Sequence, residues 1–84
     1  MAKPIDYGED ALKALRRMDR TTARRIVAKI GQLAADPASL GNNIRALKGG
    51  EGLLRLRVGD WRVIYRDGLV LAILRIAPRG SAYD

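Results

Sequence analysis

The sequence predicts an α+β fold in the order β-α-α-β-β-β, with a helical hairpin packed on one face of a small, mainly antiparallel sheet. The first half of the chain carries two amphipathic helical patterns, and the second half carries three strand patterns joined by tight-turn dipeptides. The chain has 84 residues, and we expect residues 1–84 to form a single domain. A domain of this size buries a modest fraction of its unfolded surface, so its margin of stability is small.

The helical hairpin is predicted from the spacing of apolar side chains. A short first strand is expected over residues 3–7, and residues 9–18 then place their apolar side chains on one face of a helix. A second helix begins after a cap at Asp19 or Thr21, repeats the i, i+3, i+4, i+7 apolar spacing, and ends at Asp36-Pro37. Because the link between the helices is short, we expect an αα-hairpin.

Three strands are predicted in the second half of the chain. The stretch RVGDWRVIY, residues 57–65, is predicted to form a tight β-hairpin around the two-residue turn Gly59-Asp60, and Asp67-Gly68 is a type I′ signal for the next turn. Residues 69–76 are nearly continuously apolar, which suits a central strand covered on both faces. Residues 37–52 are expected to be irregular.

Pairing through both turns assigns the strand side chains to two faces. The face toward the helices is expected to carry Leu54, Leu56, Val58, Trp61, Val63, Tyr65, Val70, Ala72 and Leu74. The opposite, outer face is expected to carry Arg55, Arg57, Arg62, Arg66 and Arg75, mixed with Ile64, Leu69, Leu71 and Ile73. Arg57 then lies directly opposite Arg62, and like charges placed in this way destabilise a sheet.

The composition favours an anionic partner. The formal net charge is +7, and nucleic acid is the most frequent partner of a small domain of this charge. The chain has no cysteine and no histidine, which excludes disulfides, thiolate metal ligands and an imidazole general base, and we expect no cofactor. No apolar run approaches the roughly 18 residues that span a bilayer. The start of the chain lacks the apolar core of a signal peptide, so we expect a soluble cytoplasmic protein.

The arginines of the outer face are the main candidates for binding an anion. A solvated face is the alternative, because long basic side chains can splay apart over apolar neighbours. The planar fork of arginine suits phosphate, and the nearby carboxylates, Asp60 and Asp67, lie in the turns rather than among the arginines. Arg79 and Tyr83 follow the last strand and extend the set. These features favour a phosphate site.

Five motifs follow one another along essentially the whole chain: ALKALRRM, a second helix that ends in DP, IRALKG, LRLRVGDWRVIY and, after a strand, PRGSAY. Together they resemble the RelE/ParE superfamily of bacterial toxins, with the RelE-like branch favoured. The resemblance implies a RelE-like microbial ribonuclease fold and a toxin of a type II toxin–antitoxin system. RelE-like toxins are ribosome-dependent ribonucleases that cut mRNA in the ribosomal A site, so the implied partners are a cognate acidic antitoxin, the ribosome and mRNA.

The resemblance also implies catalytic residues. Arg62 matches the arginine that contacts the scissile phosphate in RelE-like enzymes, and Arg79 matches the late catalytic arginine. Tyr83 matches the near-terminal tyrosine that stacks with or orients the substrate nucleotide. The implied product carries a 2′,3′-cyclic phosphate.

The implied substrate-binding residues are Lys48, Arg55 and Arg57. Arg55 stands where RelE has a lysine proposed as general base, and Leu53 stands where RelE has a second lysine. Arginine stays protonated, so Arg55 is a poor general base. Three alternatives stay open: Tyr83 with a lowered pKa, a group of the ribosome, or catalysis by charge stabilisation and positioning alone.

Other functions and surfaces also stay open. A ParE-like protein would inhibit DNA gyrase by binding, and an inactive toxin would only bind its antitoxin. The helices carry a basic set that is either a solvated face or a contact for ribosomal RNA: Arg16, Arg17, Arg20, Arg24, Arg25 and Lys29. On the outer face, we expect an exposed apolar strip to bind an amphipathic acidic segment of the antitoxin, unless the tail or the loop before residue 53 covers it: Leu69, Leu71 and Ile73.

Overall fold

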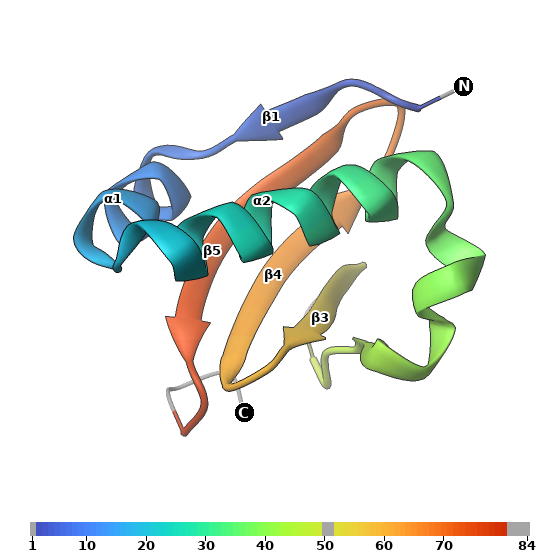
Figure 1. Ribbon diagram of the computed structural model, residues 1–84. Coiled ribbons are helices and arrows are strands. Elements are labelled where there is room, and N and C mark those ends of the chain that lie inside the picture. The colour runs from blue at the N-terminus through green and yellow to red at the C-terminus, as the bar shows by residue number, and fades with distance from the viewer. Residues whose placement is uncertain (1, 50–51, 81–84) are drawn as a thin grey trace.

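The architecture was obtained as a computed structural model, which describes residues 2–49 and 52–80. In chain order the elements are β1 (Ile5–Tyr7), α1 (Glu9–Arg17), α2 (Arg20–Ala35), the 3-10 helix η1 (Pro37–Asn43), β2 (Ile44–Ala46), β3 (Leu53–Val58), β4 (Trp61–Asp67) and β5 (Leu71–Pro78). The strands form one sheet in the order β1-β5-β4-β3-β2, in which β1 is parallel to β5 and the other neighbours are antiparallel. The predicted α+β class, with helices packed on a mainly antiparallel sheet, is confirmed (Figure 1).

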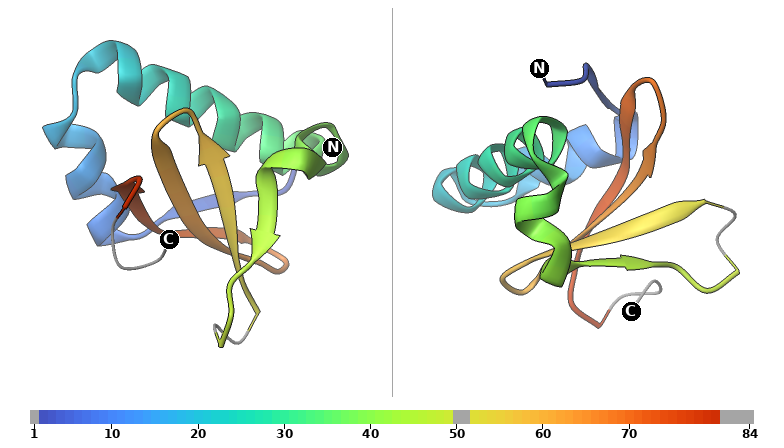
Figure 2. Two further views of the ribbon diagram at one scale, coloured as in Figure 1. Left: turned by 90° about the horizontal axis from the view of Figure 1, so that it is seen from below. Right: turned by 90° about the vertical axis from the view of Figure 1, so that its right-hand side faces the viewer.

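The hydrophobic core lies between α2 and the sheet. α2 crosses one face of the sheet, and α1 lies beside the β1–β5 edge (Figures 1 and 2). Ile26 and Ile30 of α2 are fully buried in one cluster with Leu56, Val63 and Tyr65 of the sheet. Fully burying an aliphatic side chain contributes about 1.5–3 kcal/mol, so this layer supplies most of the stability of the fold.

Asp19 is the residue that begins α2. Its carboxylate accepts hydrogen bonds from the backbone N of Thr22 (3.0 Å) and from the Thr22 hydroxyl (2.6 Å). These bonds lower the pKa of the Asp19 carboxyl and satisfy one of the backbone N–H groups that a helix start leaves without an intrahelical partner. The structure therefore selects Asp19 from the two predicted caps.

The β3–β4 hairpin has the predicted register. Val58 pairs with Trp61 and Arg57 pairs with Arg62, so Gly59-Asp60 is the two-residue turn. Gly59 has a φ of 59°, a left-handed conformation that glycine adopts without strain. Apolar and basic side chains alternate from Leu54 to Val58, and β4 follows the same pattern except at Ile64, so the register shown places most of the apolar side chains on one face.

The β4–β5 hairpin differs from the prediction. The chain turns through residues 68–70 instead of Asp67-Gly68, Asp67 pairs with Leu71, and a bulge interrupts the ladder beside Ile64 and Tyr65. Because side chains alternate between the two faces of a strand, this shift exchanges the faces of the first part of β5. Leu71 and Ile73 lie in the core, whereas Val70 and Leu74 are exposed.

The predicted apolar strip on the outer face is therefore wrong. Leu71 is 1% exposed and belongs to the core, while Leu69 is 95% exposed at the tip of the β4–β5 loop. Residues 69–74 are all apolar, so either set of alternate side chains could face the core, and the pattern could not select a register.

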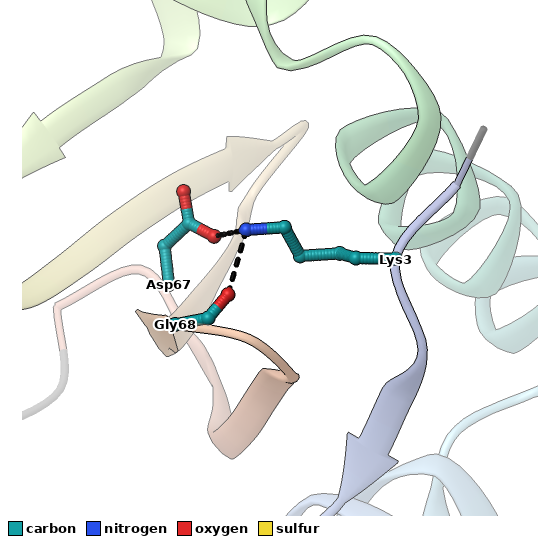
Figure 3. Close-up of polar contacts among 3 residues, drawn as sticks. All are labelled: Lys3, Asp67 and Gly68. Atoms are coloured by element: carbon teal, nitrogen blue, oxygen red, sulfur yellow. Dashed lines mark hydrogen bonds and ion pairs between the residues drawn. The ribbon is translucent and has the colours of Figure 1, made fainter.

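The amino-terminal segment contributes to the observed register of β5. The Lys3 ammonium donates to the Asp67 carboxylate and to the carbonyl oxygen of Gly68 (2.8 Å), as Figure 3 shows. The backbone N of Leu71 donates to the carbonyl oxygen of Pro4 (2.8 Å). β1 then pairs along β5, with Ile5 beside Leu71. These contacts tie both ends of the β4–β5 loop to β1.

A short strand lies within the segment predicted to be irregular. β2 pairs with β3, with Ile44 opposite Leu56 and Arg45 opposite Arg55. Three residues are too few to show a periodic pattern, and the strand forms because the edge of β3 offers it hydrogen bonds. In the part of the chain that the structure describes, no helix is long and apolar enough to cross a membrane.

The register of β5 predicts opposite outcomes for two leucines only two positions apart. Leu71→Ala is expected to lower the free energy of unfolding by about 2–5 kcal/mol, because it leaves a cavity in the core. Leu69→Ala is expected to change it by less than about 0.5 kcal/mol, because the side chain already lies in solvent. Urea unfolding of both variants is the measurement. Equal effects would show that β5 has the register of a two-residue turn.

Candidate nucleic-acid interface

Arginines from four neighbouring strands share the face of the sheet that is turned away from α2. Arg45, Arg55 and Arg75 flank Ile64 in one cross-strand row, and Arg57 lies opposite Arg62 in the next row toward the β3–β4 turn. Residues opposite each other share a face, as do residues two apart on one strand. We call this set the arginine face: Arg45, Arg55, Arg57, Arg62, Arg66 and Arg75.

The sequence predicts the shared face of five of these six residues and misses Arg45. Arg45 lies on β2, in the segment that was expected to be irregular. The one sequence feature that indicates a strand here is the triplet Ile44, Arg45 and Ala46, in which two apolar residues flank a basic one. β3 and β2 together place Arg45 beside Arg55, which lengthens the row across the sheet.

Arg62 is the most buried member of the arginine face. It is 7% exposed, and its Nη1 donates to the carbonyl oxygens of Trp61 (3.3 Å) and Gly59 (3.5 Å). Its paired neighbour Arg57 is exposed, and the carbonyl oxygen of Arg57 accepts a bond from Asn43 Nδ2 (3.2 Å). Removing a guanidinium from water is costly, and hydrogen bonds to the turn carbonyls offset part of that cost. The Arg62 side chain is thus held at the turn.

The β3–β4 turn gathers two more arginines. The backbone N of Arg79 donates to the carbonyl oxygen of Asp60 (2.7 Å), which places Arg79 beside the turn after β5 ends. On the helix side, the Arg25 guanidinium lies against Gly59, where a Cβ would come within 3.2–3.4 Å of its atoms. The guanidinium groups of Arg25 and Arg62 therefore lie at this turn, and Arg57 and Arg79 lie on the chain segments beside it. The sequence predicts Arg25 only as one of the basic residues of the helices, because a helical pattern does not show which loop a long side chain reaches.

The structure does not bring Lys48 to this turn. Leu47 N donates to the carbonyl oxygen of Leu53, so Lys48 lies in the loop before β3. β3 lies between that loop and Gly59. At about 3.3 Å per residue, the strand is about 17 Å long. Arg55 lies within β3, between the Lys48 loop and the Gly59-Asp60 turn, and is half-buried. Tyr83 lies outside the described residues.

The ionisation of the described tyrosines limits the chemistry of this region. Burial, with a smaller contribution from Asp67, raises the pKa of Tyr65 to about 12. Burial also raises the pKa of Tyr7. Both phenols are therefore protonated at neutral pH, and neither can act as a general base there. Arginine keeps its proton too, so the arginine face can stabilise negative charge but cannot accept a proton.

Within residues 2–49 and 52–80, no group of three or more carboxylates could hold a metal ion. Asp6 on β1 shares the outer face through its pairing with Ala72, in the row farthest from the Gly59-Asp60 turn. The interface is therefore suited to hold phosphate groups through guanidinium contacts.

Comparison with known proteins agrees with this architecture. Residues 5–83 match the family described as the ParE toxin of the type II toxin–antitoxin system parDE. A chain of the archaeal RelE–RelB complex from Pyrococcus horikoshii OT3 is 30% identical, with a TM-score of 0.79 over 98% of this chain and 100% of that chain. These matches define a toxin of a type II toxin–antitoxin system within the RelE/ParE superfamily. By its sequence, the chain belongs to the ParE toxin family.

Two further solved structures share the fold at lower identity. A chain of the RelBE2 toxin–antitoxin complex from Mycobacterium tuberculosis is 20% identical, with a TM-score of 0.78 over 94% of this chain and 100% of that chain. A chain of the intact Escherichia coli RelBE complex is 19% identical, with a TM-score of 0.76 over 95% of this chain and 100% of that chain. No curated protein matches the chain in sequence.

Arg57 allows a direct test of the arginine face, because it is exposed and can be replaced with little effect on the core. Arg57→Gln is expected to weaken binding of a single-stranded RNA oligonucleotide and to reduce the salt slope of log K by about 0.7, the value for one lost phosphate contact. Stability should stay equal or rise slightly, since a like-charge pair is relieved.

The matched control is Arg24→Gln, which removes an exposed arginine from α2. Its salt slope should equal that of the unmodified protein. Equal reductions in both variants would show that RNA binds the protein through diffuse charge and not through the arginine face.

Proposed function

We propose that the protein is a ribosome-dependent mRNA endonuclease, and that residues 1–84 form its single toxin domain. The observation that carries the proposal is that Arg57, Arg62 and Arg79 lie on the three chain segments that meet at the Gly59-Asp60 turn, with the Arg62 guanidinium held at the turn itself. Cations gathered at one point can stabilise the charge that develops on a phosphate during cleavage. Similarity to a chain of the archaeal RelE–RelB complex supports the assignment.

Cleavage proceeds by attack of a ribose 2′-hydroxyl on the adjacent phosphorus. The 2′-oxygen–phosphorus bond forms as the bond to the 5′-oxygen breaks, which leaves a 2′,3′-cyclic phosphate and a free 5′-hydroxyl. The proton lost from the 2′-hydroxyl is balanced by one delivered to the departing 5′-oxygen. Arg62 and Arg79 stabilise the additional charge on the phosphate oxygens, and Arg55 and Arg57 hold the flanking backbone.

Positioning and charge stabilisation supply most of the proposed rate enhancement. The arginines and the two buried tyrosines keep their protons, so the proton acceptor is either Tyr83 or a group of the ribosome. Tyr83 also positions the substrate nucleotide in this proposal. Lys48 lies at the other end of β3 and contacts a more distant part of the RNA backbone.

The proposed protein partner is a cognate acidic antitoxin. The net charge of +7 favours a negatively charged partner, and the similar chains come from RelE–RelB and RelBE complexes. Because Leu71 and Ile73 are in the core, the antitoxin cannot use the apolar strip that the sequence predicts. Its carboxylates would instead neutralise exposed members of the arginine face.

A second candidate function is inhibition of DNA gyrase by binding. The match to the ParE toxin family favours it, and so does Leu53, which stands where RelE carries a lysine. In that case the arginine face would bind DNA or an acidic surface of the topoisomerase without cleaving a nucleic acid.

Primer extension on programmed ribosomes tests the endonuclease directly. The purified toxin is expected to cut mRNA in the A site, and Arg79→Ala is expected to reduce the rate by about 10²–10³, the cost of losing one charge-stabilising group. Arg24→Gln, away from the arginine face, should cut normally.

A gyrase supercoiling assay on the same preparations separates the two functions. Loss of supercoiling without mRNA cuts would overturn the endonuclease and establish the ParE-like activity. Normal growth on strong induction of the protein alone, with neither effect, would indicate an inactive toxin that only binds its antitoxin.

A further inference from the structure

A groove on the helix side of the sheet lies next to the β3–β4 turn. It has a volume of about 380 Å³, and Met18, Trp61, Ile76 and Pro78 give it apolar walls, with Arg17 at its margin. We call it the Trp61 groove. α1 lies beside β5 and α2 crosses over it (Figure 1), and residues of α1, the α1–α2 link, β4 and β5 line the groove.

A second, more polar groove continues from the first. It has a volume of about 320 Å³ and shares Ala14, Arg17 and Ile76 with the Trp61 groove. Lys13 and Arg75 add two cations to Arg17, and Asp10 is the carboxylate among the described lining residues. Arg75 belongs to the outer face by its pairing with Ile64, but its side chain lines this groove together with residues of α1. An apolar pocket therefore opens into a cationic one.

The Trp61 side chain is partly buried in the core and partly accessible from the groove. It packs against the core cluster and is half-buried, so part of the indole lines the groove. Among the described residues that line the Trp61 groove, the one carboxylate belongs to Asp19, which accepts two hydrogen bonds from Thr22. The groove thus presents an aromatic surface with cations nearby, the combination with which proteins hold the bases and backbone of single-stranded nucleic acid.

The Trp61 groove adjoins the phosphate site through the chain itself. Trp61 precedes Arg62, Pro78 precedes Arg79, and Trp61 pairs with Pro78 across β4 and β5. Because successive side chains of a strand point to opposite faces, the groove and the Arg57–Arg62 pair lie on the two faces of the same end of the sheet. Arg25 lies against Gly59 on the helix side of the turn between them.

We propose that the Trp61 groove is a base-binding subsite for single-stranded RNA. An RNA strand held at Arg62 and Arg79 passes over the Gly59-Asp60 turn, where Arg25 contacts its backbone, and inserts the next base against Trp61. Arg17 then meets the following phosphate. This subsite deepens, and rests on, the RNA-cleaving function proposed above, and it gives the toxin a contact with a nucleotide that it does not cut.

The single tryptophan makes the subsite directly observable, because all indole fluorescence comes from Trp61. The intact protein is titrated with a single-stranded RNA hexamer and, in parallel, with an abasic sugar–phosphate chain of the same length. Both should bind, as measured by the anisotropy of a labelled end. Only the RNA should quench the Trp61 emission.

Two substitutions of Trp61 separate stacking from packing. Trp61→Phe should keep the RNA affinity, and Trp61→Leu should weaken it about tenfold, the loss expected for one base–aromatic stack. Neither should change the affinity for the abasic chain. Arg17→Gln should weaken RNA binding, while Arg24→Gln, whose side chain lines neither groove, should not.

Several results would overturn the subsite. These are RNA binding without quenching, equal quenching by the abasic chain, no RNA binding at low salt, or equal affinities of Trp61→Leu and Trp61→Phe. A change in emission with purified antitoxin but none with RNA would assign the groove to the protein partner. Quenching by RNA bases without A-site cleavage would keep the subsite and overturn only the ribonuclease.

Discussion

The pairing of Arg57 with Arg62 is the constraint on which the functional surface depends. Two like charges directly opposite each other cost a strand pair about 0.2–1 kcal/mol. Each buried aliphatic side chain on the other face of the same strands contributes about 1.5–3 kcal/mol. Because Leu56 and Val63 are fully buried beneath α2, the core keeps the register in spite of the repulsion. The fold thus holds the backbones of Arg57 and Arg62 directly opposite each other on one face of the sheet.

The charged side chains and the core lie on opposite faces of the sheet, because successive side chains of a strand point to opposite faces. Apolar side chains face α2, and the same strands direct arginines outward in three cross-strand rows, of which the Arg57–Arg62 row lies nearest the Gly59-Asp60 turn. Ile64, on the outer face, is only 2% exposed, and its cross-strand neighbours are Arg55 and Arg75. The stems of arginine side chains can cover apolar surface while their charged ends reach solvent. An anion that binds there would meet cations already positioned by the sheet.

The sequence predicts those parts of the fold in which the pattern of apolar and polar residues is compatible with a single strand register. The β3–β4 hairpin follows from the alternation of apolar and basic residues on β3 and from the glycine turn, and with it the position of Arg62. The register of β5 could not be predicted, because residues 69–74 are all apolar and β1, tied by Lys3, helps to select one register. Arg45 depends on a three-residue strand that exists only through pairing, and Arg25 reaches the turn by a tertiary contact.

The central claim is that the arginine face is a preformed site for phosphate. Its most direct test is the melting temperature of the protein in inorganic phosphate and in chloride at equal ionic strength. A ligand that binds only the folded state raises stability by mass action. The account predicts a higher melting temperature in phosphate, and it predicts that Arg57→Gln loses most of this difference while Arg24→Gln keeps it. Equal melting temperatures in the two salts, or a phosphate effect unchanged in Arg57→Gln, would contradict it.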